Sequence, residues 1–357
     1  MQPRGWTIGV AAFALLALSA CATYPEERFL PLTASDAGTP PQSLSIMTYN
    51  IEGLPWPARS GRGPFLEAIS AELARMDTVG ALPEVVVFQE AFSTSALEAA
   101  ANNPHPVLAF GPRRRTDTSF ARAIDPALQR RNILRGEWGI KVFGGGLAVA
   151  SHYPISVVAI EPFGPRSCAG WDCLSNKGMM LVQVHLPGLT DPVEVLTTHM
   201  NSQGSSGVSV EKQTAAHRVQ SEQLAQFIDQ HSISDNPLVI AGDFNMRGSP
   251  QRFDAFERET GFNLARRYCL EAQSNQDREN CEIAVSFDGD APWLDTQDLQ
   301  IFDDGAHIAL RPTRLEAWFD GEDAGGELSD HDAYIVTYAL EARTGRIGHA
   351  EQGEPGD

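Results

Sequence analysis

Short apolar runs that end beside a polar side chain recur along the chain. Leu238–Ala241 is rich in β-branched residues, follows Asn-Pro and precedes a glycine, as a buried strand does. It leads directly to Asp243 and Asn245. An isolated Asp-x-Asn is usually a loop acid with its Asx-turn partner. Four other apolar runs repeat the arrangement, with polar residues at Asn50, Glu90, His199 and Asp330-His331. Strand ends are where α/β sheets place binding and catalytic residues, so we expect one shared site.

Helical periodicity alternates with these runs and indicates an α/β domain. Amphipathic helices are predicted over Pro64–Met76, Glu211–Asp229 and Pro250–Thr260, and Ser93 is a suitable N-cap for a helix that ends at Ala101. The predicted strands are Leu44–Ile51, Val85–Phe88, Leu147–Ala150, Met179–Val184, Val193–Thr198, Leu238–Ala241 and Ala333–Leu340, with further strand-like segments near 299–302 and 313–319. Length permits two domains, but one large sandwich accommodates these elements as well.

The N-terminus has the pattern of an export signal. Arg4 precedes an apolar run, Trp6–Leu18, that is shorter than the roughly 20 residues of a membrane-spanning helix. Residues 1–20 are therefore expected to be a signal peptide. The segment Leu18-Ser19-Ala20-Cys21 resembles the bacterial lipobox, which implies acylation of Cys21. Ala22 is not acidic, which implies an outer-membrane lipoprotein; the alternative is a plain cleaved signal.

Composition divides the rest of the chain into three parts. Residues 21–42, with four prolines and little periodicity, are expected to form the lipid-attachment site and a tether. Residues 43–340 are expected to form the folded domain. Gly, Arg, Glu and Pro in residues 341–357 indicate a flexible tail.

The net charge argues against a nucleic-acid partner. The chain of 357 residues carries a formal charge of −19, and the first twenty residues hold one Arg and no acid. Such a field opposes the phosphate contacts that supply much of DNA affinity. Residues 111–141 are the exception, with eight basic and three acidic residues, a local balance of +5. Two interpretations stay open: a solvated insertion, or a loop that faces phosphate or an anionic surface.

Besides Cys21, the cysteines form two local pairs, Cys168 with Cys173 and Cys269 with Cys281. An even number at short spacing in an exported protein favours disulfides, and the local connectivity is our prediction among three. A zinc site is the alternative, but neither pair has Cys-x-x-Cys spacing.

The residues at the strand ends are acids, amides and histidines without cysteine. Their oxygen atoms suit Mg²⁺, with Mn²⁺ as an alternative, and such ions usually complete their coordination with water and phosphate. No Gly-x-Ser-x-Gly nucleophile motif is present, and the glycines at 144–146 lack the Lys-Ser/Thr of a Walker loop. A water nucleophile with a histidine base is therefore expected.

Five motifs in order resemble the endonuclease/exonuclease/phosphatase superfamily. They are Thr48-Tyr49-Asn50-Ile51, Phe88-Gln89-Glu90, Thr198-His199, Gly242-Asp243-Phe244-Asn245 and Leu328-Ser329-Asp330-His331. The resemblance spans residues 44–340. It implies a four-layer α/β/β/α sandwich of two mixed β-sheets, with a site at one end that hydrolyses phosphate esters with a divalent metal. Residues 43–340 would then be the catalytic domain.

The resemblance also implies the roles of the site residues. Glu90 would be the direct metal ligand, with Asn50 beside it and Asp330 supporting the metal side. His331 would be the general base for an in-line water. Asp243 would orient the nucleophile or leaving group, and Asn245 and His199 would hold charge on the phosphoryl oxygens.

Two departures from the family pattern affect these roles. The acid that orients the base normally precedes an apolar strand, and here both Asp295 and Asp298 are candidates. We prefer Asp295 because it follows a leucine as in the family. His152 stands in a segment where relatives usually carry Arg, and we expect it to belong to the scaffold.

The segment Asp172-Cys173-Leu174-Ser175-Asn176-Lys177-Gly178 resembles neutral and bacterial sphingomyelinases. It implies a phospholipid phosphodiesterase, in which Lys177 either faces phosphate or is a surface lysine in a turn. A secreted metal-dependent nuclease is the alternative enzyme, and a membrane-anchored binding module with a decayed site is the alternative outside enzymes. The sequence leaves the head group, the physiological metal and the oligomeric state open.

Overall fold

A computed structural model of the chain describes residues 22–32, 38–56, 58–274, 281–284, 296–319 and 327–343. The expected signal peptide, Cys21, Asp295 and residues 344–357 of the expected tail lie outside these ranges. Within them, no helix is both long enough and apolar enough to cross a membrane.

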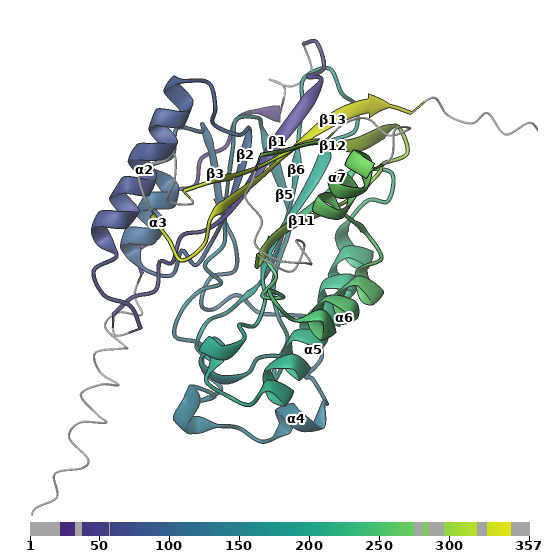
Figure 1. The fold of residues 1–357 in the computed structure, drawn as a ribbon. Helices are drawn as coiled ribbons and strands as arrows, with labels where there is room; N and C mark the ends of the chain where they lie inside the picture. The colour runs from purple at the N-terminus through teal and green to yellow at the C-terminus, as the bar shows by residue number, and fades with distance from the viewer. Residues whose placement is uncertain are drawn as a thin grey trace, which may run out of the picture.

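Two mixed β-sheets pack face to face (Figure 1). The first sheet has the order β10-β12-β13-β1-β2-β4-β3 and the second the order β5-β6-β7-β8-β11-β9. The strands of the first sheet are β1 (Ser43–Asn50), β2 (Val85–Gln89), β3 (Val107–Phe110), β4 (Ala148–Ser151), β10 (Glu282–Ala284), β12 (Ile308–Trp318) and β13 (Ala333–Ala342). Those of the second are β5 (Ile155–Pro162), β6 (Gly178–Val184), β7 (Val193–His199), β8 (Leu238–Asp243), β9 (Asn263–Leu264) and β11 (Asp298–Asp303).

Helices cover the outer faces of both sheets. α2 (Gly63–Thr78) and α3 (Thr94–Ala101) pack on the first sheet, and α5 (Val210–His231) and α6 (Pro250–Thr260) pack on the second. α7 (Ala265–Ser274) closes one margin of the space between the sheets, against β11 and β12. The predicted four-layer α/β/β/α sandwich is confirmed. Short helical turns lie at α4 (Pro126–Gln129), Ile133–Arg135, Gly170–Leu174 and Gly204–Ser206.

The alternation of side chains along β1 explains the layers. Leu44 and Ile46 point into the core between the two sheets, whereas Met47 and Tyr49 point into the core under α2 and α3. All four are fully buried, and each buried apolar side chain of this size stabilises the fold by about 1.5–3 kcal/mol. Both faces of the strand are therefore apolar up to the point where Asn50 ends it.

The strand directions bring the polar residues to one end of the sandwich. β1 and β2 are parallel, with Asn50 opposite Gln89, and β7 and β8 are parallel, with His199 opposite Asp243. β11 runs antiparallel to β8 and begins where Asp298 lies opposite Asp243. The carboxyl ends of two parallel pairs and the start of an antiparallel strand thus share one edge.

Both predicted disulfides, Cys168–Cys173 and Cys269–Cys281, are present. The first fastens the turn at Gly170–Leu174, and the second joins α7 to the residue before β10. The local connectivity predicted from the spacing is confirmed.

Candidate active site

Side chains from the two sheets meet directly at the shared edge. Asn50 at the end of β1 donates through Nδ2 to Asp243 Oδ2 at the end of β8, over 3.0 Å. Asp243 Oδ2 lies 3.3 Å from His199 Nε2, which in turn lies 3.9 Å from Glu90 Oε1. Four of the residues predicted to share a site are therefore linked in one chain of contacts.

The backbone turns sharply at two of these positions. Glu90 and Asn245 have φ angles of 59° and 52°, in the left-handed region that non-glycine residues seldom adopt. Such residues cost on the order of 1–3 kcal/mol and cluster at functional sites. Gly242, which precedes Asp243, faces the backbone of β7, where a Cβ would lie 2.2 Å from the Thr198 carbonyl oxygen. This close approach requires glycine immediately before Asp243.

His331 is held between carboxylates. Its Nδ1 lies 2.5 Å from Asp298 Oδ2, and its Nε2 lies 4.0 Å from Asp243 Oδ2 and 3.3 Å from Gln297 Nε2. Burial lowers the pKa of His331, but Asp298, Asp243 and Glu90 more than compensate, and the pKa lies well above its usual range. The imidazolium form is therefore stabilised.

The acid that contacts His331 Nδ1 is Asp298, the alternative that the sequence left open. Asp295, which we preferred, lies outside the described residues. Asp298 is the first residue of β11, and its place in the sheet is fixed by pairing with Asp243. Its side chain is buried, and Oδ1 has no hydrogen-bond partner, so the carboxylate depends on His331 for compensation.

His199 lies beside a buried cation. Lys177 Nζ lies 2.9 Å from His199 Nε2, donates to the Met200 carbonyl oxygen and forms an ion pair with Asp172. Burial, followed by the charges of Lys177 and His331, holds the pKa of His199 well below its usual range. His199 is therefore neutral, and its Nδ1 is buried without a hydrogen-bond partner. Lys177 is not a surface lysine; it belongs to the site's supporting network.

Asn245 continues the turn after β8. Its backbone N–H donates to Asp243 Oδ1 over 2.9 Å, and its Nδ2 donates to the Met200 carbonyl oxygen over 3.2 Å. The Asx turn expected for an Asp-x-Asn is thus present. The turn lies at the shared edge with the other polar residues, so it forms part of the predicted site.

Buried negative charge defines the electrostatics of the site. Burial raises the pKa of Glu90 to about 7, although Lys177 and His331 oppose this shift. Burial also raises the pKa of Asp243 to about 6, and it raises the pKa of Asp298. Several carboxylates that are costly to ionise in one place favour a cation beside them.

The donor atoms fit a hard divalent cation. Glu90 and Asn50 supply oxygens, and all four cysteines of the described residues are tied up in disulfides. Among the described residues, no three His, Cys, Asp or Glu side chains are arranged as a complete metal cage. Mg²⁺ usually takes only one or two protein carboxylates and keeps water and phosphate oxygens as its other ligands, so this open arrangement suits it.

Asp330 lies at the rim of the site. Its side chain is half exposed, forms an ion pair with Arg59 over 2.9 Å and lies 3.9 Å from His331 Nε2. The structure thus places Asp330 beside His331 and gives it a surface arginine as its nearest partner.

Sequence reasoning missed the residues that brace the site. Asp172 was noted only as part of a motif, yet it binds Lys177 and also accepts hydrogen bonds from Ser202. Arg62 donates to the carbonyl oxygens of Ile51 and Leu328, which ties the loop after β1 to the loop before β13. No local pattern around Arg62 predicts contacts that depend on the tertiary fold.

A sequence profile of the Endonuclease/Exonuclease/phosphatase family matches residues 47–298. This range begins in β1 and reaches the first residue of β11, so it contains Asn50, Glu90, His199, Asp243 and Asn245. The predicted family resemblance is confirmed.

Two curated relatives are sphingomyelinases by name. Sphingomyelin phosphodiesterase 2 of Rattus norvegicus is 25% identical over 211 residues, which are 56% of this chain and 49% of that protein. Sphingomyelinase C 2 of Leptospira interrogans is 24% identical over 288 residues, which are 75% of this chain and 42% of that protein. The matches thus span about half the length of these relatives or less. They agree with the resemblance that Asp172–Gly178 suggested.

Solved structures share the fold. The beta toxin of Staphylococcus aureus, in a structure with bound magnesium ions, superimposes with a TM-score of 0.55 at 17% identity and covers 83% of this chain and 99% of its own. At this identity the likeness establishes the architecture.

Proposed function

Because the chain belongs to the endonuclease/exonuclease/phosphatase family, we propose that it is a divalent-metal-dependent phosphodiesterase of the sphingomyelinase-like branch. One observation carries the proposal: Asp298 holds His331 at the edge where Asn50, Glu90 and Asp243 converge from two sheets. That arrangement offers a base with its orienting acid next to an oxygen-rich cation site.

His331 is the base in this proposal. Nε2 accepts the proton of the attacking water, and the Asp298 carboxylate at Nδ1 fixes the ring and stabilises the imidazolium that forms. Asp243, 4.0 Å from Nε2, orients the nucleophile or leaving group.

A second group of side chains is proposed to stabilise the charge that develops on the phosphoryl oxygens. His199 and Asn245 supply the side chains that face it, and Lys177 acts through His199, from which its Nζ lies 2.9 Å. Donors that are fixed in place before the reaction cost no reorganisation when charge builds up, so such groups contribute strongly to catalysis. Lys177 is therefore a positioning residue.

Glu90 and Asn50 are the proposed metal ligands, with Asp330 supporting them from the rim. A bound Mg²⁺ or Mn²⁺ would neutralise buried carboxylate charge and polarise the phosphoryl oxygen. Burial, with smaller contributions from the charges of Asp243 and Asp330, raises the pKa of Glu90 to about 7, and such an ion would stabilise the charged carboxylate.

The substrate is proposed to be a phospholipid with a phosphodiester head group, most directly sphingomyelin. The two curated relatives carry that activity in their names, and the formal charge of −19 opposes long contacts with a nucleic acid. A nuclease is the second candidate, favoured by the local charge of +5 in residues 111–141. The intact set of acids, amides and histidines counts against a binding module with a decayed site.

A substrate panel tests the proposal. The purified chain should hydrolyse sphingomyelin in detergent micelles with Mg²⁺ and lose activity in EDTA. Glu90→Gln should raise the Mg²⁺ concentration for half-maximal activity about tenfold or more, because a charged ligand is lost. Sphingomyelin hydrolysis should change little with salt, whereas DNA cleavage would fall steeply. Plasmid cleavage without sphingomyelin hydrolysis would establish the nuclease, and full activity in EDTA would refute the mechanism.

A further inference from the structure

A cavity outside the active site is lined by basic side chains. Its volume is about 430 Å³, within the range of small-molecule sites and larger than a bare phosphate requires. The 111–141 segment and residues 163–176 form its walls, and none of the proposed catalytic or metal-binding residues lines it. Six cations line it: Arg114, Arg115, Arg122, Arg131, Lys141 and Arg166. Two acids, Asp117 and Glu137, are the acidic residues of the lining.

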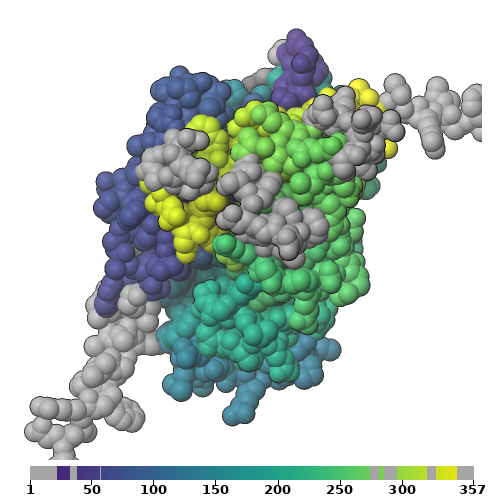
Figure 2. Space-filling model, viewed as in Figure 1, coloured from purple at the N-terminus to yellow at the C-terminus, as the bar shows by residue number. Residues whose placement is uncertain are grey.

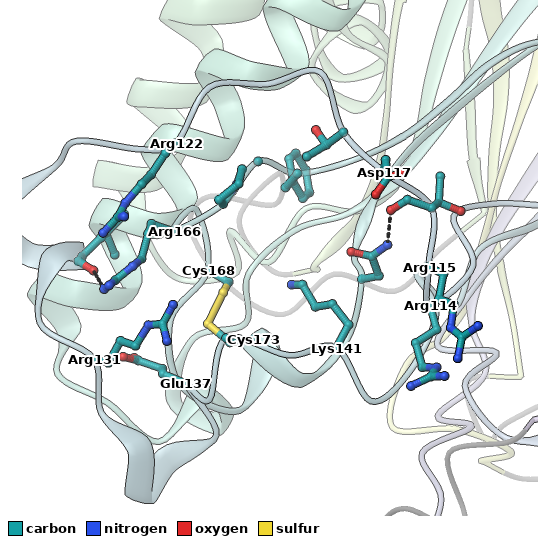
Figure 3. Close-up of a pocket in the computed structure, with 18 residues that line it drawn as sticks. Arg114, Arg115, Asp117, Arg122, Arg131, Glu137, Lys141, Arg166, Cys168 and Cys173 are labelled. Carbon is teal, nitrogen blue, oxygen red and sulfur yellow. Dashed lines mark hydrogen bonds between the residues drawn. A yellow bond between two sulfur atoms is a disulfide. The ribbon is translucent and has the colours of Figure 1, made fainter.

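The cations surround the cavity from opposite sides. Figure 3 shows Lys141 between Arg122, Arg131 and Arg166 on one side and Arg114 and Arg115 on the other. In the described part of the chain, none of these six cations forms an ion pair with a carboxylate. Positive charge therefore exceeds negative charge in the lining, by six cations to two acids.

Of the acids near the cavity, Glu137 and Asp125 are occupied elsewhere, and Asp117 can offset only one of the six lining cations. Glu137 forms an ion pair with Lys212 and accepts hydrogen bonds from the backbone of Asn132 and Gly170. Asp125 pairs with Arg218. Because these carboxylates serve the scaffold, the lining cations are left to bind an anion from outside.

Lys141 is half-buried and likewise has no carboxylate partner in the described part of the chain. Its ammonium group has three donors, and its hydrogen bond goes to the Ser175 carbonyl oxygen over 2.8 Å. Burial lowers the pKa of Lys141 to about 8, Asp172 opposes this, and Lys177 adds to it. Nearby, Arg166 Nε is buried and has no hydrogen-bond partner. Donors on both side chains thus remain to be satisfied.

We propose that this cavity is a phosphate-binding site, separate from the active site, that accepts the phosphate group of a small ester. Arginine guanidinium groups form paired hydrogen bonds with phosphate, and a lysine adds a point charge. Phe163, Pro165 and Leu128 give the cavity apolar wall as well, which suits an ester with a carbon moiety. Two sources carry this chemistry, an anionic phospholipid head group and a soluble phosphate ester.

Exposed apolar residues in the segment that lines the cavity help to distinguish a phospholipid head group from a soluble ester. Ile124 and Leu134 are each 89% exposed and belong to the same 111–141 segment. Figure 2 shows this segment as the blue-teal end of the molecule, beside the start of α5. Basic residues interspersed with exposed apolar ones suit contact with an anionic bilayer.

The site adjoins the active site without sharing its residues. Asn176 lines the cavity and precedes Lys177, which lies beside His199, and Lys141 binds the carbonyl oxygen of Ser175 in the same turn. One short segment thus separates the cavity from the proposed catalytic residues. Because the two share no residue, binding at the cavity can be measured separately from catalysis.

Phosphate binding in EDTA tests the site independently of catalysis. Without metal, the acidic active site repels phosphate, so inorganic phosphate titrated by calorimetry should bind at the cavity. Arg122→Glu, at an exposed position, should weaken binding about tenfold or more. Lys141→Met should do the same, because it removes the half-buried ammonium group. Arg130→Glu is the matched control, since it makes the same charge change in the same segment but does not line the cavity.

Vesicles distinguish the two sources. If phosphatidylcholine vesicles with phosphatidic acid bind the wild type, and Arg122→Glu weakens this more than Arg130→Glu, the occupant is a lipid head group. If glycerol phosphate binds and only its binding depends on Arg122, the occupant is a soluble ester. The proposal is refuted if phosphate does not bind in EDTA, or if Arg130→Glu weakens phosphate binding as much as Arg122→Glu. Neither result depends on hydrolysis, so the proposed function can fail or hold separately.

Discussion

At the scale of single residues, the contact between Asp298 and His331 predicts how kcat responds to substitution. Asp298→Asn removes the charge that stabilises the imidazolium, so we expect kcat to fall about 100-fold, as for His331→Ala. The double variant should lose little more than either single one, because residues that act as a unit are not additive. Steady-state kinetics on the three variants measures this.

Asp303→Asn is the matched control for that experiment, since Asp303 is the exposed residue at the other end of β11. It should leave kcat near the wild-type value. If Asp295→Asn loses activity and Asp298→Asn keeps it, the acid that orients His331 is Asp295.

Lys177 gives a prediction about stability. Its side chain is 8% exposed and pairs with Asp172, which is equally buried. Lys177→Met leaves a buried carboxylate without its cation and should lower the free energy of unfolding by about 3–5 kcal/mol. Urea denaturation is the measurement. Asp172→Asn in the same chain should recover part of the loss, because it removes the uncompensated charge.

Lys141→Met is the comparison for this prediction. Lys141 is half-buried, donates to a carbonyl oxygen and forms no ion pair with an acid in the described ranges. Its replacement should therefore cost less than that of Lys177. Equal losses for the two lysines would mean that the ion pair with Asp172 contributes nothing specific.

At the scale of elements, the disulfides differ in the loops that they close. Cys269–Cys281 spans 12 residues and Cys168–Cys173 spans 5. In the chain-entropy account, the longer loop stabilises the fold by about 3 kcal/mol and the shorter by about 2 kcal/mol. Double replacement by alanine should therefore lower the melting temperature more for the 269–281 pair. Peptide mapping without reduction checks the connectivity, and four free thiols in the oxidised protein would contradict it.

Elements with a clear period were predictable from the sequence. The helix over Pro250–Thr260 is found with those bounds, and Ser93 caps α3 through the N–H of Ala96, as expected. Edge elements were missed. Two of the eight residues of β5 (Ile155–Pro162) are exposed valines, and α7 (Ala265–Ser274) follows the two-residue strand β9 without a break. Their apolar residues serve tertiary packing, so no regular local pattern reveals them.

At the scale of the whole molecule, the sequence predicted which residues approach one another but not how they pair. Asn50, Glu90, His199 and Asp243 were recognisable because each ends an apolar strand. The hydrogen bond between Asn50 and Asp243 joins the two sheets, and only the packing of those sheets determines it. The contact between Asp298 and His331 likewise depends on where β11 starts, and the pairing of β11 with β8 fixes that start.

Stability against acid is also a property of the whole fold, and one histidine gives a test far from the active site. His105 is buried, and its Nε2–H donates to the Pro83 carbonyl oxygen over 2.8 Å. Burial lowers the pKa of His105 to about 4, the Pro83 bond and the charges of Asp77 and Glu84 oppose this, and His152 adds to it. The folded protein therefore keeps His105 neutral under conditions in which the unfolded chain binds a proton.

The sign of the effect follows from that difference. Below the ordinary histidine pKa of about 6.5 the unfolded state takes up a proton that the folded state refuses, so stability falls with pH until about 4. Between pH 7 and pH 5 the loss due to His105 should reach about 2 kcal/mol. His105→Gln keeps a donor for Pro83 but does not titrate. Between pH 7 and pH 5, the unfolding free energy of this variant should therefore fall by about 2 kcal/mol less than that of the wild type. Urea denaturation at both pH values measures the difference, and equal pH dependence in the two proteins would show that His105 is protonated in the native state.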